Sequence, residues 1–449
     1  MDKLDIYNRL PVFAQNIACY YKGRQIRKKR YSKKFWKLLT EYEKRSNWSY
    51  EQLCDYRDTK LRQMIKHSYN TVAYYRNLFN KLGIHYEDIK TLEDLSLLPI
   101  LNKQTIIDNF NDFISKSINS REIVISHTSG TTGSGFRFYT TEDAISEQWA
   151  VWWRYRRNLG ISFSKWCAHF GSQLIVPVSH NKPPFWRINE PNKQIYFSAF
   201  HENDDNLYYY YKVIKKRQLK WVHGFPSLIT LLAAFIINNN LNLGYKVDII
   251  TIGAENLLEF QQKIIEKAFG TKVFQHYGLA EGVSNFSETK SGEILIDEDF
   301  AITELIPDGE TYRIIGTNLT NYSMPLIRYD TQDTATYQFD KKSGKRVITS
   351  IDGRKEDYIT LPNGTKVGKL DHAFKDTINF KEVQLYQDLN YNIKIFAVKR
   401  ESNISNDEKI AMELLRKSLG WDISIEFKYV DKIKPTSGGK LRFVKSEIK

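Results

Sequence analysis

One loop in the sequence is rich in glycine and in hydroxyl side chains, a composition that suits phosphate groups. It reads Thr-Ser-Gly-Thr-Thr-Gly-Ser-Gly over 128–135 and closely follows the β-rich run Ile123–Ile125. Glycines let successive backbone N–H groups turn toward one point, and the hydroxyls add donors, so the loop suits a polyphosphate. It lacks the lysine and the spacing of GxxxxGK[ST], and it is not GxGxxG. An ordinary turn between strands fits the composition equally well.

Five later segments carry groups that would complete a nucleotide site. They hold carboxylates and an aromatic hydroxyl in the middle of the chain, an arginine beside acids, and a lysine on a Gly-Gly loop near the end. In chain order they are Gly253–Glu255, Tyr277–Glu281, Pro325–Asp333, Gly353–Asp357 and Pro435–Lys440. Each segment alone is a weak to moderate signal, but six motifs in this order are a strong one.

Together the loop and the five segments resemble the motifs of the adenylate-forming superfamily, which includes the acyl-CoA synthetases. The similarity is greatest to the phenylacetate–coenzyme A ligase branch and, within it, to the CapK-like members of capsular polysaccharide biosynthesis. It extends over nearly the whole chain, including Ile6–Pro11 and Leu95–Lys103. The resemblance implies an enzyme that uses ATP and Mg²⁺ to activate a carboxylic acid as an acyl-adenylate. Pyrophosphate leaves, and the acyl group then passes to an acceptor.

The resemblance also assigns nucleotide-binding roles to individual residues. It places the phosphates of ATP against Thr128, Ser129, Gly130, Thr131, Thr132 and Gly133. It assigns the rest of the nucleotide to Gly253, Ala254, Glu255, Tyr277, Gly278, Asp333 and Arg354. Tyr277 lies against adenine, and Arg354 faces the ribose or the α-phosphate. Asp333 accepts both ribose hydroxyls, which suits a carboxylate because it can take two hydrogen bonds at once.

Three further residues complete the machinery that the resemblance implies. Glu281 helps to hold Mg²⁺, Glu356 is the hinge between two domains, and Lys440 is the catalytic lysine. A lysine on a Gly-Gly loop can reach the reacting phosphate only when the site closes. The sequence departs from the family pattern at Ser134, Gly135, Asn256, Ala280, Gln332 and Glu356.

The acid-binding pocket is marked less clearly. Four residues lie where this branch builds it, namely His169, Gly171, His223 and Pro226. The histidines have the chemistry of bases that would deprotonate an amine acceptor. A lone histidine near a strand end is more often structural, and the nearby aromatic cluster Trp149–Trp153 is more often plain core. Both interpretations stay open.

The sequence also leaves two kinds of acyl acceptor open. One is coenzyme A, and the other is an amine or hydroxyl of a sugar or glycan. The capsule branch favours the sugar, and Ser179–Trp186 offers polar donors beside an aromatic ring. A different hypothesis is a catalytically lapsed, nucleotide-binding scaffold, which the departures Gly135, Ala280 and Gln332 favour. Nucleic-acid binding is a third hypothesis, supported only by charge, and we expect no nucleic-acid partner.

Hydrophobic periodicity predicts the elements that position these groups. Residues 1–115 are expected to be mostly helical. From Ile123 to Tyr329 short β-rich runs alternate with helices such as Leu258–Phe269, which indicates an α/β fold with mainly parallel sheets. We therefore expect a large α/β domain over 1–351. A small, mobile α+β domain should follow over 352–449, with a hairpin at Val383–Val398 and a helix at Asp407–Leu419 capped by Asn406.

Composition predicts a cytoplasmic protein, with peripheral association at the inner face of the membrane left open. The N-terminus has acids where a signal peptide has only bases, and the three cysteines form no CxxC pair. The net charge of +14 suggests an anionic partner. Lys22–Lys37 holds nine basic residues and no acidic one, among aromatics. An anionic bilayer, a phosphorylated carrier lipid, nucleic acid and a merely solvated helix face all fit this run.

Overall fold

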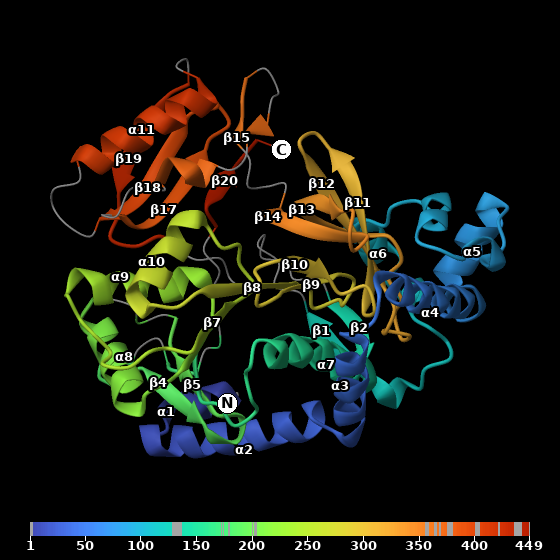
Figure 1. The fold of residues 1–449 in the computed structure, drawn as a ribbon, viewed down its shortest axis with the longest axis horizontal. Coiled ribbons are helices and arrows are strands. Elements are labelled where there is room, and N and C mark those ends of the chain that lie inside the picture. Colours follow the sequence, from blue (N-terminus) through green and yellow to red (C-terminus); the bar gives the residue numbers. More distant parts are fainter. Residues whose placement is uncertain are drawn as a thin grey trace. The chain divides into compact units, whose positions relative to one another are not determined.

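The computed structural model contains two compact units that interleave along the sequence (Figure 1). The first unit comprises 1–21, 164–274 and 353–449, and the second comprises 22–163 and 275–352. The structure describes residues 3–127, 137–171, 173, 175–177, 180–199, 201, 204–354, 359–362, 366–367, 370–374, 380–399, 405–420, 423–434 and 442–448.

The first unit contains a sheet of largely parallel strands. Strand β3 (Cys167–Phe170) pairs in parallel with β5 (Gln194–Phe197) and with β6 (Trp221–Gly224), and β6 pairs in parallel with β7 (Ile249–Ile252). Strand β4 (Trp186–Asn189) closes the edge in the antiparallel sense. All four residues of β7 are buried, as expected for a strand covered on both faces.

Helices of the first unit pack their apolar residues against this sheet. They are α8 (Asp204–Arg217), α9 (Pro226–Asn238) and α10 (Glu259–Phe269), and they share one buried cluster with the parallel strands. Helix α9 is apolar on nearly every side, which is typical of a helix inside a core. The helix predicted at Leu258–Phe269 and the strands predicted at 221–222 and 249–252 are confirmed.

The C-terminal part of the first unit builds its own sheet and core. Its strands are β17 (Phe380–Gln387), β18 (Ile393–Lys399), β19 (Ile425–Tyr429) and β20 (Val444–Ser446), with the short pair β15 (Ile359–Thr360) and β16 (Lys366–Val367) beside them in sequence. The predicted hairpin is confirmed as β17 and β18. Helix α11 (Ser405–Leu419) begins before Asp407, so Asn406 lies in its first turn and was wrongly predicted as the cap. The division at residue 352 stays a prediction.

The second unit combines helices from 22–163 with an antiparallel sheet from 275–352. Its helices include the second half of α2 (Val12–Arg30) and all of α3 (Lys33–Arg45), α4 (Tyr50–Thr71), α5 (Ala73–Leu82), α6 (Lys103–Asp108) and α7 (Glu142–Asn158). The short α1 (Lys3–Arg9) and the first half of α2 belong to the first unit. The predominantly helical start of the chain is thereby confirmed. Helix α4 buries Leu61, Met64, Ile65 and Ser68, which lie three or four residues apart and so share one face.

The sheet of the second unit runs in the order β11–β12–β13–β14–β10–β9–β8. The strands are β8 (Val273–Gly278), β9 (Asn285–Glu288), β10 (Ile294–Ile296), β11 (Ala301–Asp308), β12 (Thr311–Asn318), β13 (Tyr329–Asp340) and β14 (Lys345–Arg354). The alternation of helices and strands up to Tyr329 had indicated parallel pairing, and this antiparallel sheet was not predicted. Short connections explain much of it: two residues join β11 to β12, four join β13 to β14 and six join β8 to β9, and only antiparallel neighbours can be joined by such short turns.

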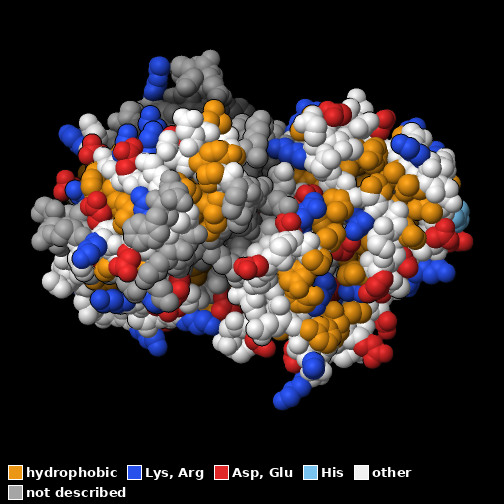
Figure 2. Space-filling model, turned by 90° about the horizontal axis from the view of Figure 1, so that it is seen from above, with side chains coloured by type: hydrophobic (Ala, Val, Ile, Leu, Met, Phe, Trp, Pro, Cys, Tyr) orange, Lys and Arg blue, Asp and Glu red, His pale blue; other side chains and the backbone are white. Residues whose placement is uncertain are grey.

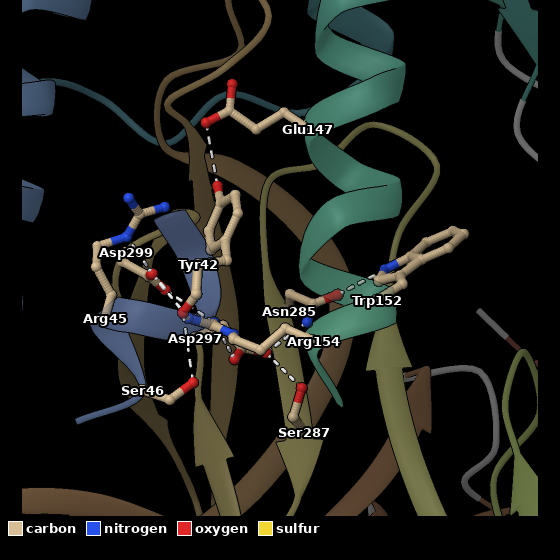
Figure 3. A network of polar contacts seen from close by, with 10 residues as sticks. All are labelled: Tyr42, Arg45, Ser46, Glu147, Trp152, Arg154, Asn285, Ser287, Asp297 and Asp299. Atoms are coloured by element: carbon tan, nitrogen blue, oxygen red, sulfur yellow. Dashed lines mark hydrogen bonds and ion pairs between the residues drawn. The ribbon is translucent and has the colours of Figure 1, made fainter. Parts of the chain in front are cut away.

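A buried network of charged groups ties helices α3 and α7 to the loop that follows β10 (Figure 3). Arg154 donates to both oxygens of Asp299 at 2.7 and 2.9 Å and to Asp297 at 2.7 Å. Arg45 donates to Asp299 at 2.7 Å. Burial raises the pKa of Asp299, but the charges and hydrogen bonds of Arg154 and Arg45 together outweigh burial and hold that pKa below its usual value.

Candidate functional site

In the first unit, four parallel strands bring polar side chains to one level of the sheet. His169 of β3 is in register with Tyr196 of β5 and with His223 of β6, and His223 is in register with Thr251 of β7. Residues in register on adjacent strands point to the same face. The rings of His169 and His223 are accordingly 5.4 Å apart. These residues lie close to the carboxyl ends of their strands, which is where open α/β sheets bind ligands.

The hydrogen bonds of His223 indicate which of its nitrogens carries the proton. Its Nδ1 lies 3.1 Å from the carbonyl oxygen of Thr251 and 2.9 Å from the hydroxyl of the same residue. A carbonyl only accepts, so Nδ1 is the donor, and the neutral imidazole carries its lone pair on Nε2. That tautomer can accept a proton. His169 is held differently, with its Nε2 3.3 Å from Oε1 of Gln173.

Gly224 allows the ends of β3 and β6 to approach each other, and Gly171 leaves room for the side chain of His169. A Cβ on Gly224 would lie 1.8 Å from the carbonyl oxygen of Phe170, and the φ of Gly224 is +149°, so only glycine fits there. A Cβ on Gly171 would lie 2.9 Å from Nε2 of His169. Pro226 then starts helix α9 at a position where its missing N–H costs nothing.

The loop after β7 carries the predicted nucleotide residues Gly253, Ala254 and Glu255. Glu255 accepts hydrogen bonds from the hydroxyl of Ser227 at 2.7 Å and from its backbone N–H at 3.3 Å. Gly253 donates its backbone N–H to Gly224 at 3.3 Å, so the loops after β6 and β7 are joined. Ala254 has a φ of +67°, a left-handed conformation that is strained for alanine and that often marks functional loops.

In the second unit, the structure brings together two predicted residues that are far apart in sequence. The hydroxyl of Tyr277 donates to Oδ2 of Asp333 at 2.8 Å. Burial and the charge of Asp333 raise the pKa of Tyr277 well above its usual value, so the hydroxyl keeps its proton and remains a donor. The ring of Tyr277 also stacks on Phe286 at 4.8 Å. Asp333 thus has a fixed carboxylate with acceptor capacity left for a ligand hydroxyl.

Gly278 is supported by residues that sequence motifs did not identify. A Cβ there would lie 2.8 Å from Oδ1 of Asn285, which accepts from Nε1 of Trp152 at 2.9 Å. Asn285 also donates to Asp297. Desolvation lowers the pKa of the adjacent His276 to about 3, so this histidine stays neutral. These residues come from segments distant in sequence, so only the fold brings them together.

Gln332 adopts a left-handed conformation where the family pattern has glycine, with a φ of +65°. It is exposed, so the conformation is imposed by the backbone rather than by packing of the side chain. Replacing Gln332 with glycine should raise the free energy of unfolding by about 1 kcal/mol, because the left-handed strain of a non-glycine residue disappears. Urea denaturation would measure this change.

Gln338, an exposed residue of the same strand, provides a matched control. Gln338 has no left-handed backbone conformation, so replacing it with glycine relieves no strain. The free energy of unfolding should fall by about 0.5–1 kcal/mol. Opposite signs for the same substitution in one strand are the expected result. Equal losses at both positions would contradict the strain interpretation.

Glu281 has the chemistry of a magnesium ligand. It is 7% exposed, and its backbone carbonyl accepts from Asn318 at 2.9 Å, which fixes the loop after β8. No cluster of three or more metal-binding side chains occurs among the residues that the structure describes. Mg²⁺ is commonly held by one or two carboxylates together with substrate phosphates and water, so one buried carboxylate fits a metal that arrives with ATP.

Several predicted residues lie outside the described part of the chain. They are Lys440, Glu356 and the phosphate loop Thr128–Gly133; Arg354 ends strand β14, but its side chain is not described. The strands that flank the loop are described. His127 of β1 (Ile123–His127) pairs with Arg137 of β2 (Arg137–Thr141), so the loop leaves and returns at neighbouring points.

Sequence comparisons show that the chain is similar to the CapK protein and to phenylacetate–coenzyme A ligases. Residues 359–447 match the family model of the CapK C-terminal domain. The protein CapK of Staphylococcus aureus is 27% identical over 459 residues, which cover 99% of each chain. A phenylacetate–coenzyme A ligase of Pseudomonas putida is 24% identical over 367 residues, or 74% of this chain and 78% of that one.

Solved structures share the fold of this chain. A 2-hydroxyisobutyryl-CoA ligase, in the postadenylation state with 2-HIB-AMP, superposes with a TM-score of 0.68. The identity is 18%, and the alignment covers 87% of this chain and 89% of that one. The predicted resemblance and fold class are confirmed by these matches.

Proposed function

We propose that this chain, which is similar to protein CapK and to the phenylacetate–coenzyme A ligases and shares the fold of an acyl-CoA ligase, activates a carboxylic acid and transfers the acyl group to a sugar. The first step joins a carboxylate oxygen to the α-phosphorus of ATP and breaks the bond to pyrophosphate. The pairing of Tyr277 with Asp333 is the observation that carries this proposal. It provides a fixed carboxylate beside an aromatic ring, a combination that suits a ribose and its base.

The residues of this chain serve mainly to position reactants and to neutralise charge. A carboxylate is a weak nucleophile, and negative charge builds on the phosphoryl oxygens and on the leaving group. We assign the phosphates to the backbone N–H groups of Thr128–Gly133 and to the ammonium of Lys440. Mg²⁺ held at Glu281 would supply further positive charge. Arg354 faces the nucleotide, and Glu356 is the proposed hinge.

The acyl pocket is proposed at the carboxyl ends of β3 and β6. His169, Gly171, His223 and Pro226 form this region of the first unit. His223 is the better base of the two histidines, because its Nδ1 is engaged by Thr251 and its neutral form accepts a proton on Nε2. It would take the proton from an attacking amine or hydroxyl during acyl transfer.

A cleft in the first unit has a lining that would suit a sugar ring. It has a volume of about 620 Å³ and includes residues of the segment 180–186 that suggested a sugar from sequence. Its lining offers amides, a carboxylate and half-exposed aromatic rings, among them Asn181, Asn206, Asn239, Asp205, Tyr208 and Tyr209. Among the described residues that line it there is no lysine or arginine. A phosphate-rich molecule such as coenzyme A would favour basic groups.

Pyrophosphate release with a panel of carboxylic acids tests the proposed activation step. Release that depends on a carboxylate supports it, whereas no release with any acid would favour the lapsed scaffold. The acceptor is tested next by offering an amino-sugar nucleotide and coenzyme A separately to the enzyme with its adenylate. Thioester without ester or amide would show that coenzyme A, the alternative acceptor, is correct.

Replacing Asp333 with alanine should weaken ATP binding about 10- to 150-fold. The substitution removes a charge-assisted hydrogen-bond acceptor worth roughly 1.5–3 kcal/mol. Isothermal titration calorimetry would measure the affinity, with thermal unfolding to confirm the fold. Asp330, which pairs with Arg313 at 2.5 Å, is the matched control, and its replacement with asparagine should leave ATP affinity nearly unchanged. Equal affinities in wild type and Asp333→Ala would contradict the ribose assignment.

A further inference from the structure

The N-terminal helices expose an unusual concentration of large apolar side chains. Phe13 is 69% exposed, Tyr21 62% and Ile17 52%, and the others are Ile6, Leu10 and Tyr20. Single exposed apolar residues are normal on soluble proteins, but a contiguous group marks a binding surface. No helix within the described ranges combines the length and apolarity that crossing a bilayer would require.

The exposed residues of α2 lie on one face of the helix. At 3.6 residues per turn, Phe13, Ile17, Tyr20 and Tyr21 fall within about 100° of arc. Two basic residues, Arg24 and Lys28, continue the same face toward the end of the helix, and both are exposed. The face is therefore apolar along its first half and basic along its second half.

Contacts on the opposite side and on one flank of α2 fix its orientation. Gln15 is 2% exposed and accepts from Nε of Arg187 at 2.6 Å. Its amide donates to the carbonyls of Tyr7 and Leu10 at 3.1 and 3.0 Å, which ties α1 to α2. Asn16 accepts from the backbone N–H of Ile188 at 3.0 Å. The helix cannot turn its apolar face inward without breaking these bonds.

From these observations we infer that the exposed face of α2 docks on an anionic lipid bilayer, with Phe13, Ile17 and Tyr21 inserted at the interface. Exposed aromatic and aliphatic side chains next to basic ones suit the headgroup region of a bilayer, where the rings leave water and the basic groups meet phosphate. Anionic lipid attracts the basic half, while the apolar half gains from leaving water.

Charge favours a membrane over a second copy of this chain. The sequence contains no acidic residue from Ile6 to Thr40. A symmetric dimer through this face would place the basic residues of both copies close together. By contrast, acidic and basic side chains are interspersed on the face drawn in Figure 2. Some basic residues of the run have partners in the protein, since Lys34 pairs with Asp143 at 2.5 Å.

Vesicle flotation with the full chain tests this inference. Wild type should bind vesicles of phosphatidylcholine with phosphatidylglycerol and bind pure phosphatidylcholine less. The triple variant Phe13→Gln, Ile17→Gln, Tyr21→Gln should partition onto these vesicles at least ~10-fold less than wild type, because three apolar side chains no longer leave water. Glutamine at Arg24 and Lys28 should remove most of the preference for phosphatidylglycerol, and raised salt should act in the same direction.

The matched control is the double variant Phe339→Gln, Leu389→Gln, at side chains that are 60% and 67% exposed. It should bind the vesicles as wild type does. Circular dichroism would verify that each variant is folded. Absence of wild-type binding to phosphatidylglycerol vesicles overturns the inference, as does unchanged binding by the triple variant. A dimer that the triple variant dissociates, seen by light scattering without vesicle binding, would identify a second copy as the occupant. None of these outcomes depends on catalytic activity.

Discussion

Replacing Lys440 with alanine should lower carboxylate-dependent pyrophosphate release by at least ~100-fold. The ammonium is proposed to stabilise charge that develops on the phosphoryl group, and removal of one such group typically costs that factor. The effect should fall on the rate of the first step more than on ATP affinity, because the interaction forms mainly in the transition state. The measurement is pyrophosphate release at saturating ATP and acid.

Lys434 precedes the same loop and is exposed, so Lys434→Ala is the matched control. It removes a charge close in sequence and should keep near-wild-type release. Adenylate supplied directly should still be consumed by the Lys440 variant when an acceptor is present, since that step no longer requires charge stabilisation at the α-phosphate. Near-wild-type release by Lys440→Ala would show that this lysine is not catalytic.

Replacing Arg154 with methionine should lower the free energy of unfolding of the protein by about 3–5 kcal/mol. Breaking a buried ion pair leaves uncompensated charge, here on Asp297, while Asp299 keeps only its bond to Arg45, and this is the usual size of the penalty. Arg154 is 7% exposed at its side chain, and Asp299 is 2% exposed. Denaturant unfolding at neutral pH would measure the loss.

Arg157 is the matched control on the same helix. It pairs with Glu43 at 3.0 Å, but its side chain is 46% exposed, so Arg157→Met should cost at most about 1 kcal/mol. Lowering the pH should reduce the loss of unfolding free energy that Arg154→Met causes. Burial already raises the pKa of Asp297 above its usual value, and loss of the Arg154 charge raises it further, so protonation stabilises the folded variant as pH falls through the raised pKa. A deficit that is small at neutral pH, or grows in acid, would contradict this account.

The sequence determined the elements whose signals are local. The helix at 259–269, the strands at 221–224 and 249–252, and the hairpin of β17 and β18 all follow from periodicity and turn residues within a few positions. The predicted start of helix α11, Asp407, lies two residues after the observed start at Ser405. The capping signal at Asn406 competes with the helix propensity around it. The six motifs predicted the family from order and spacing, without any knowledge of the fold.

Tertiary structure alone decided which distant residues meet. Tyr277 and Asp333 are joined by a hydrogen bond across 56 positions, and strand register brings His169 beside His223 across 54 positions, far more than a turn spans. Nothing local specifies such pairs, because they depend on which strands pair and in what register. The antiparallel sheet of the second unit and the exposed face of α2 were likewise decided by packing. Whether an apolar residue is buried depends on what covers it, and local sequence does not determine that.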